Sequence, residues 1–150
     1  MPFPTLLAHA ALLARLAAPY PFAVGETLQY EAKLGYIPVG TATMTVHPMT
    51  REQGKEAFMF AASGEGRPMG LRVGAELTSY VGKLGFNSLR FHRRVFQGAS
   101  VDEAQYQIIP DSSRYRQDGV PQDWAAPRDP LVELAFLYYL RTVPLKVGST

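Results

Sequence analysis

Basic side chains are concentrated in residues 88–97, a segment that reads SLRFHRRVFQ. In an extended strand, alternate residues point to opposite faces, so two arginines and a histidine share one face while Arg93 lies among apolar residues on the other. Guanidinium groups beside an aromatic-lined interior can bind the phosphate or carboxylate of an amphipathic ligand. The pattern therefore favours anion recognition. The candidate ligand-binding residues are Arg90, His92, Arg93, Arg94, Tyr106 and Tyr138.

A solvated strand face is the alternative explanation for the same charges. Asp102 and Glu103 follow in the next segment and can balance them, and exposed ion pairs usually contribute little. Arg93 is the exception, because an inward-facing guanidinium needs a partner. The expected partner is Asp102, diagonally across the hairpin that these two segments would form.

Motifs for catalysis or metal binding are not found in the sequence. The three histidines, His9, His47 and His92, lack the spacing of a helical zinc site, and the absence of cysteine excludes thiolate ligands and disulfides. No nucleophile elbow or dinucleotide-binding spacing occurs. The thirteen Asp and Glu residues could include a catalytic pair, but the sequence alone does not place two of them at the separation that a glycosidase requires. We expect no catalytic residue, no metal and no cofactor.

The segments that would position the candidate residues alternate between apolar and polar side chains, as strands do. Residues 27–34 show the pattern most regularly, and it predicts that Leu28, Tyr30, Ala32 and Leu34 form a dry face. Residues 41–46 should pair with that strand across a loop at 35–40. Residues 56–63 are apolar on both faces, which suits a strand covered on both sides.

A second hairpin is predicted from residues 88–97 and 100–109, which Gly98 and Ala99 join in the manner of a type II′ turn. This turn sets Phe91 opposite Tyr106 and Arg94 opposite Glu103. Further strands are expected at 75–81 and 113–117. Loops are expected at 64–74 and at 118–123, a linker that Trp124 would anchor.

One helix is predicted from Asp129, which can cap it, to the residues before Pro144. Its residues 131–140 have almost no polar side, so the helix should be wrapped by apolar material. The apolar run is too short to span a bilayer. The fold class that follows is mainly β, a curved antiparallel meander sheet forming a half-barrel packed around one C-terminal apolar helix.

Residues 1–18 read as a signal peptide or an N-terminal apolar leader, and residues 19–150 as a single β-rich domain. No basic residue precedes the apolar run and Arg15 lies inside it, so an amphipathic helix packed on the domain and a misplaced start codon are alternatives. Fifteen Lys and Arg against thirteen Asp and Glu give a formal charge of only +2, which offers no case for nucleic-acid binding.

Three stretches of the sequence resemble the domain of unknown function 3108 family of bacterial exported proteins. They are PFAVGETLQY at residues 21–30, GYIPVGTA at 35–42, and DPL at 129–131 continuing to YYLRTVPLKVG at 138–148. Members of this family usually begin with a signal peptide and continue with further strands. The resemblance implies an exported protein of the periplasm or cell envelope, of which this chain would be the N-terminal half, and it supplies no catalytic residues.

These observations favour an exported envelope protein that binds a lipid or another hydrophobic or amphipathic ligand in a half-barrel, with Arg93 or its neighbours near the polar end. Two alternatives remain open at this point. One is a structural or assembly factor that pairs with an envelope partner through a sheet edge, and the other is a carboxylate-dependent hydrolase.

Overall fold

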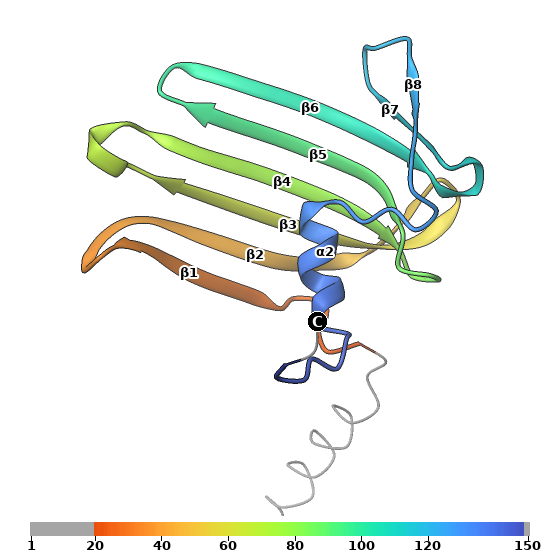
Figure 1. Cartoon of the computed structure of the whole chain (residues 1–150), viewed down its shortest axis with the longest axis horizontal. Coiled ribbons are helices and arrows are strands. Elements are labelled where there is room, and N and C mark those ends of the chain that lie inside the picture. Colours follow the sequence, from red (N-terminus) through yellow and green to blue (C-terminus); the bar gives the residue numbers. More distant parts are fainter. Residues whose placement is uncertain (1–19, 149–150) are drawn as a thin grey trace, which may run out of the picture.

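A computed structural model of the chain describes residues 20–148, which form one unclosed, curved antiparallel sheet with a single C-terminal helix packed against it (Figure 1). Each strand pairs with its neighbours in sequence, in the order β1 to β8. The strands are β1 (Thr27–Leu34), β2 (Ile37–Glu52), β3 (Lys55–Gly66), β4 (Val73–Gly82), β5 (Ser88–Gln97), β6 (Ser100–Ile109), β7 (Arg114–Gln117) and β8 (Asp123–Ala125). The helix is α2 (Glu133–Leu140). The predicted fold class is confirmed.

The two faces of the sheet differ in chemistry because side chains alternate along each strand. The strand pairing aligns a largely apolar row across the face that carries α2, formed by Val46, Phe60, Ser79, Phe91 and Tyr106. On the opposite face the pairing aligns Glu76, Arg94 and Glu103. The sheet therefore has one apolar face and one face of balanced charge.

The core lies between α2 and the centre of the sheet. Helix α2 contacts β3 and β4 and buries Leu134, Ala135 and Tyr138. The Tyr138 ring stacks on Phe60 with 3.9 Å between ring centroids, and Phe22 packs edge-on against both rings. Aromatic pairs of this kind add to the stabilisation gained from burial alone.

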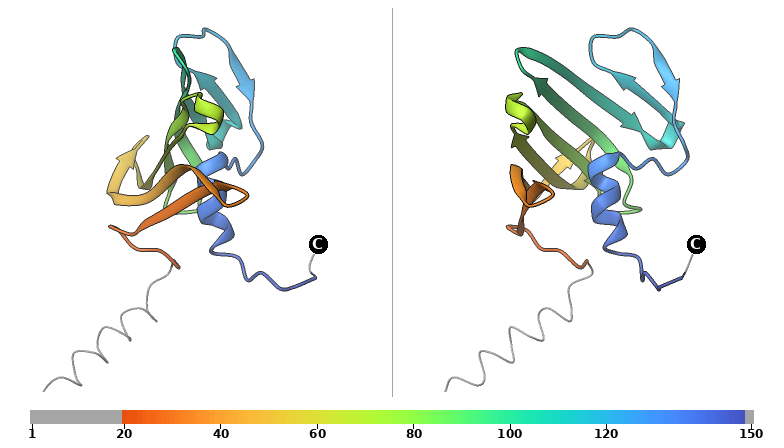
Figure 2. Two further views of the ribbon diagram at one scale, coloured as in Figure 1. Left: turned by 90° about the vertical axis from the view of Figure 1, so that its left-hand side faces the viewer. Right: turned by 60° about the vertical axis from the view of Figure 1, so that its left-hand side comes forward.

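Apolar material does not wrap α2 on all sides, so that expectation is wrong. Phe136, Leu137 and Tyr139 are exposed, because the sheet curls past only one side of the helix (Figure 2). The face of α2 that points away from β3 and β4 is an apolar surface open to solvent.

Helix α2 begins four residues later than predicted, and Asp129 does not cap it. Residues 126–132 are instead extended across the sheet, held by Ser88 of β5. The Ser88 N–H donates to the Pro130 carbonyl at 2.9 Å, and the Val132 N–H donates to Ser88 Oγ at 3.0 Å. A hydroxyl from a distant strand thus satisfies a backbone donor at the start of the helix.

The C-terminal end of α2 is fastened to the segment before β1. The Arg141 guanidinium binds both carboxylate oxygens of Glu26 and donates to the Pro21 carbonyl at 2.8 Å. It also lies over the rings of Phe22 and Tyr138. The hydrogen bond and charge of Glu26 raise the pKa of Arg141, against a smaller opposing effect of burial.

The turn between β2 and β3 folds over strands that are not its neighbours in the sheet. Gln53 Nε2 donates to the carbonyls of Leu89 and Ile108, each at 2.8 Å. Glu52 lies 3.1 Å from Arg90 Nη2 on the face of balanced charge. Because β2 has a bulge between His47 and Thr50, this hairpin bends away from the side of the sheet that carries α2 (Figure 2).

The second predicted hairpin is confirmed in its bounds and register. Strands β5 and β6 begin and end where expected, Phe91 pairs with Tyr106, and Arg94 pairs with Glu103. Gly98 has a φ of 59°, the conformation that the first central residue of a type II′ turn requires.

Other local predictions are wrong in detail. Where a loop was predicted at 35–40, the structure has only a turn at Gly35 and Tyr36. Where a loop was predicted at 64–74, only residues 67–72 lie outside strands, and they include a 3-10 turn. Residues 123–125 form strand β8, so Trp124 pairs with Tyr115 and is not in a linker.

The expected dry face of β1 is wrong. Tyr30 is 51% exposed and Leu34 is 65% exposed, because β1 is the outermost strand and α2 lies over β3 and β4. Alternation along a strand predicts two different faces, but it does not reveal whether the apolar face is covered.

The predicted leader, residues 1–18, lies outside the described residues. Within residues 20–148, no helix has the length and apolar content needed to cross a membrane.

Candidate ligand-binding pocket

A pocket of about 480 Å³ lies between the later strands of the sheet and the extended segment that leads into α2. Ligand sites are typically clefts of this order of size. The sheet contributes Phe91 and Arg93 from β5, Tyr106 and Ile108 from β6, and Tyr115 from β7. The other wall is formed by Ala126, Pro127, Pro130, Leu131, Val132 and Glu133.

The aromatic wall of the pocket follows from the strand register. Phe91 pairs with Tyr106, and their rings stack with centroids 6.4 Å apart. The next row of the sheet pairs Ile108 with Tyr115, and Tyr115 stacks on Trp124 at 5.4 Å. The β7–β8 hairpin turns toward the face that carries α2 (Figure 2), and its Tyr115 lines the same pocket as Phe91 and Tyr106.

The opposite wall is extended rather than helical because strand β5 and the turn before β7 hold its backbone. Ser88 of β5 makes the two hydrogen bonds described above, and Ala126 N–H donates to the Ser113 carbonyl at 2.7 Å. Pro127 and Pro130 have no N–H to satisfy, so they fit a segment that crosses the sheet without joining it. The pocket therefore has two fixed walls.

Arg93 is the cation among the residues that line the pocket. Its Nη2 lies 2.7 Å from Asp102 Oδ2, which confirms the predicted diagonal partner. The Arg93 side chain is 35% exposed and that of Asp102 is more exposed still, so solvent screens this ion pair. A ligand carboxylate or phosphate could therefore compete with Asp102 for the guanidinium.

Glu133 is the one carboxylate among the described residues that line this pocket. It lies in the first turn of α2, where the helix dipole favours a negative charge. Hydrolysis by paired carboxylates requires two such groups facing one substrate. The lining of the pocket does not supply that arrangement.

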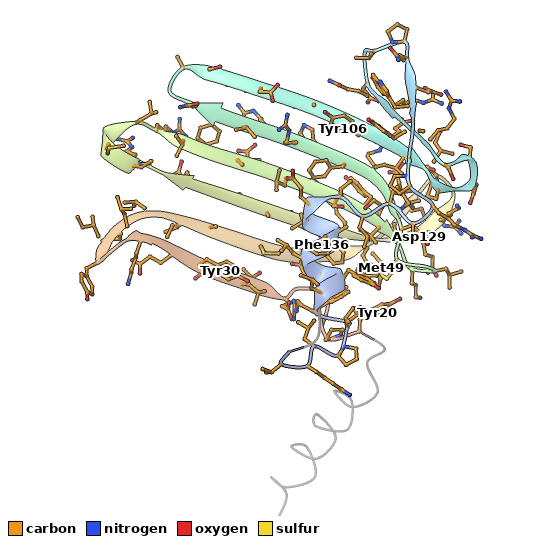
Figure 3. All side chains as sticks on the ribbon, in the orientation of Figure 1. Tyr20, Tyr30, Met49, Tyr106, Asp129 and Phe136 are labelled. Atoms are coloured by element: carbon orange, nitrogen blue, oxygen red, sulfur yellow. The ribbon has the colours of Figure 1, made fainter. Side chains whose placement is uncertain are left out.

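The structure separates the six candidate residues into three groups. Arg93 and Tyr106 line the pocket together, and Figure 3 shows Tyr106 on the sheet beyond the N-terminal end of α2. Tyr138 is fully buried in the core, away from the pocket lining. The remaining three lie on the opposite face of the sheet.

Each of these three residues on the opposite face has a carboxylate neighbour. Arg90 Nη2 is 3.1 Å from Glu52, His92 Nε2 is 2.8 Å from Glu103, and Arg94 Nη1 is 3.2 Å from Glu76. The charges on this face are thus arranged as alternating pairs rather than as one basic patch.

Sequence reasoning missed most of the lining. Tyr115 could have been found from the alternation of residues 114–117, which places it opposite the charges of Arg114 and Arg116. No alternation or motif in residues 126–132 predicts that this segment lines a pocket, because its position depends on hydrogen bonds to Ser88, which is distant in the sequence. Within residues 20–148, no three His, Asp or Glu side chains gather in a way that could hold a metal ion.

Comparisons with protein-family models, with curated proteins and with solved structures return no match to this chain. The resemblance to the domain of unknown function 3108 family therefore stays a prediction.

Proposed function

We propose that this protein binds an apolar or amphipathic small molecule in the pocket between β5, β6, β7 and residues 126–133. The observation that carries the proposal is the lining itself, in which aromatic and aliphatic side chains form two fixed walls and one guanidinium lies among them. Most ligand sites combine an apolar surface with a few polar groups that fix orientation.

The polar end of the ligand would lie beside Arg93. An anionic head group can form charge-assisted hydrogen bonds with the guanidinium, displacing the exposed Asp102 carboxylate. The apolar part would lie against Phe91, Tyr106 and Ile108, which are buried or half-buried residues on paired strands. Both parts of an amphipathic molecule thus have a counterpart in the pocket.

Titration with a matched pair of probes tests this proposal. Decanol and decanoate carry the same chain length but differ in head-group charge, and binding of each is followed by calorimetry and by the fluorescence of Trp124, the only tryptophan in the chain. Trp124 stacks on Tyr115, which lines the pocket, so an occupied pocket should change its emission. We expect both probes to bind. The proposal would be overturned if neither decanol nor decanoate bound, or if only one of them did.

The role of Arg93 is tested by substitution. Arg93→Met should weaken decanoate binding about tenfold or more, the loss expected for a charge-assisted hydrogen bond, and leave decanol binding unchanged. Asp102→Asn should strengthen decanoate binding, because it removes the competing carboxylate. Arg94→Met is the matched control, since this side chain is 39% exposed on the same strand but lies on the opposite face. Equal effects of the two arginine substitutions would show that Arg93 has no particular role.

We also propose that the protein is exported to the periplasm or cell envelope. The apolar residues 6–18 and the resemblance to an exported family support this location. Fractionation of cells that express the full chain, with mass analysis of its N-terminus, would detect cleavage near residue 19.

A further inference from the structure

We infer that the free edge of β1 pairs with β1 of a second copy of this chain, antiparallel and about a two-fold axis at Ala32. Strand β1 is the outermost strand of the sheet, and within residues 20–148 no element pairs with its outer side (Figure 1). At eight residues it is a long edge, and unpaired edges of this kind are templates for pairing with another chain. The opposite edge, β8, has only three residues.

The hydrogen bonds to β2 determine which backbone groups of β1 are free. Val46 N–H donates to the Glu26 carbonyl at 2.9 Å, so this carbonyl faces β2. Groups that face β2 and groups that face outward alternate along an antiparallel strand, so the N–H and C=O groups of Gln29 and Glu31 point outward. The register shift between Ala32 and Lys33 places its extra residue in β2, and Lys33 pairs with Pro38, which has no N–H. Lys33 therefore continues the outward-facing series, in the spacing that a further antiparallel strand requires.

Charges on β1 favour this particular partner. Glu31 and Lys33 lie on the same face of the strand, 2.8 Å apart and both about half exposed. When the axis passes through Ala32, Glu31 of each copy lies opposite Lys33 of the other. Moving the axis by one residue in either direction places Glu31 opposite Glu31 or Lys33 opposite Lys33, which is destabilising. The edge is thus complementary to itself in one register.

The other face of β1 gains from the same register. Tyr30 of each copy would lie opposite Leu34 of the other, covering side chains that are 51% and 65% exposed in the single chain. Figure 3 shows Tyr30 on β1, away from α2. Ala32 is small enough to allow close approach at the axis. An interface confined to one strand is smaller than a standard protein interface, so we expect a weak, concentration-dependent dimer.

Sedimentation of the full chain over a wide concentration range tests this inference. We expect a monomer that converts to a dimer as concentration rises. Glu31→Lys and Lys33→Glu should each raise the dimer dissociation constant about tenfold or more, because each replaces attraction by repulsion at two symmetric positions. An equimolar mixture of the two variants should restore the dimer, since each then meets the opposite charge.

The mixing step separates a lost interface from a damaged monomer. Lys55→Glu is the matched control, because Lys55 belongs to a comparable exposed ion pair with Asp111 far from β1. A chain that stays monomeric at every concentration overturns the inference. A dimer that tolerates both single charge changes also overturns it, because the interface would then lie elsewhere.

A cysteine at the axis tests the register directly, since the chain contains no cysteine of its own. Ala32 would face its own copy at a non-hydrogen-bonded position, where Cα atoms are about 4.5 Å apart, within the range a disulfide allows. The Ala32→Cys variant should form a disulfide-linked dimer under mild oxidation, whereas Lys55→Cys should not. Failure of the Ala32→Cys variant to link, or equal linking of both variants, would reject the proposed axis. The edge and the pocket are separate, so decanol binding should be the same in all these variants.

Discussion

Among single residues, Tyr138 is a group whose acidity the fold changes. Its side chain is fully buried, and its hydroxyl has no hydrogen-bond partner among the described residues. Burial, with a further contribution from the Glu26 carboxylate, raises the pKa of Tyr138 from 10.0 to about 12. The phenol is therefore held in its neutral form well above the pH at which an exposed tyrosine ionises.

This shift predicts how stability depends on pH. Below pH 10 the hydroxyl is protonated in both the folded and the unfolded chain, so it contributes no pH dependence. Between pH 10 and about 12 the unfolded chain releases the proton and the folded chain retains it, so the free energy of unfolding should fall by up to about 1.4 kcal/mol per pH unit. Denaturant titrations of the wild-type chain at several pH values measure this slope.

The Tyr138→Phe variant is the control for that slope. It keeps the ring that stacks on Phe60 and removes the ionisable group, so the alkaline loss of stability should become smaller. At neutral pH the variant should be as stable as the wild-type chain or more so, because a buried hydroxyl without a partner is removed. An unchanged slope in the variant would mean that other groups cause the alkaline transition.

At the scale of elements, the extended segment before α2 depends on one side chain. Ser88 is fully buried and bonds this segment through both its N–H and its hydroxyl. The Ser88→Ala variant leaves the Val132 N–H without that acceptor, so the free energy of unfolding should fall by about 1–3 kcal/mol. Because Val132 lines the pocket, decanol affinity should fall as well.

Ser79→Ala provides a matched comparison for Ser88→Ala. Ser79 lies on the neighbouring strand β4 and is equally buried, but its hydroxyl has no partner among the described residues. Its replacement should therefore change stability much less than that of Ser88. Chemical denaturation of both variants checks the pair, and similar losses would show that burial rather than hydrogen bonding explains the effect.

The contrast between local and distant contacts explains which elements could be predicted from sequence. The bounds and register of the β5–β6 hairpin could be predicted, because the turn at Gly98 and Ala99 determines them locally. The start of α2 could not be predicted, because the hydroxyl that replaces Asp129 as its cap comes from Ser88 on a distant strand. For the same reason Arg93 and Tyr106 were found as pocket residues, whereas the wall at 126–132 was not.

At the scale of the whole molecule, an open sheet should be unevenly protected from hydrogen exchange. Amides of β3 and β4 lie between paired strands and beneath α2, whereas the amides of Gln29, Glu31 and Lys33 point away from the sheet. Exchange measured residue by residue in dilute solution should be slow for the first group and fast for the second. If the β1 edges of two copies pair, raising the protein concentration should slow exchange at these three β1 amides. Uniform protection across the sheet in dilute solution would contradict the description of the sheet as open at β1.

The order of the strands has a consequence for how the chain acquires its structure. Since every strand pairs only with its neighbours in sequence, each new hairpin closes a short loop, and closing short loops is fast. The sheet can therefore grow strand by strand from its amino-terminal side as the chain is synthesised. The contact of Arg141 with Glu26, 115 residues apart, has to wait until Arg141 has been synthesised. Docking of the helix therefore follows growth of the sheet, and the cavity for a small molecule is complete only once its second wall, residues 126–133, is present.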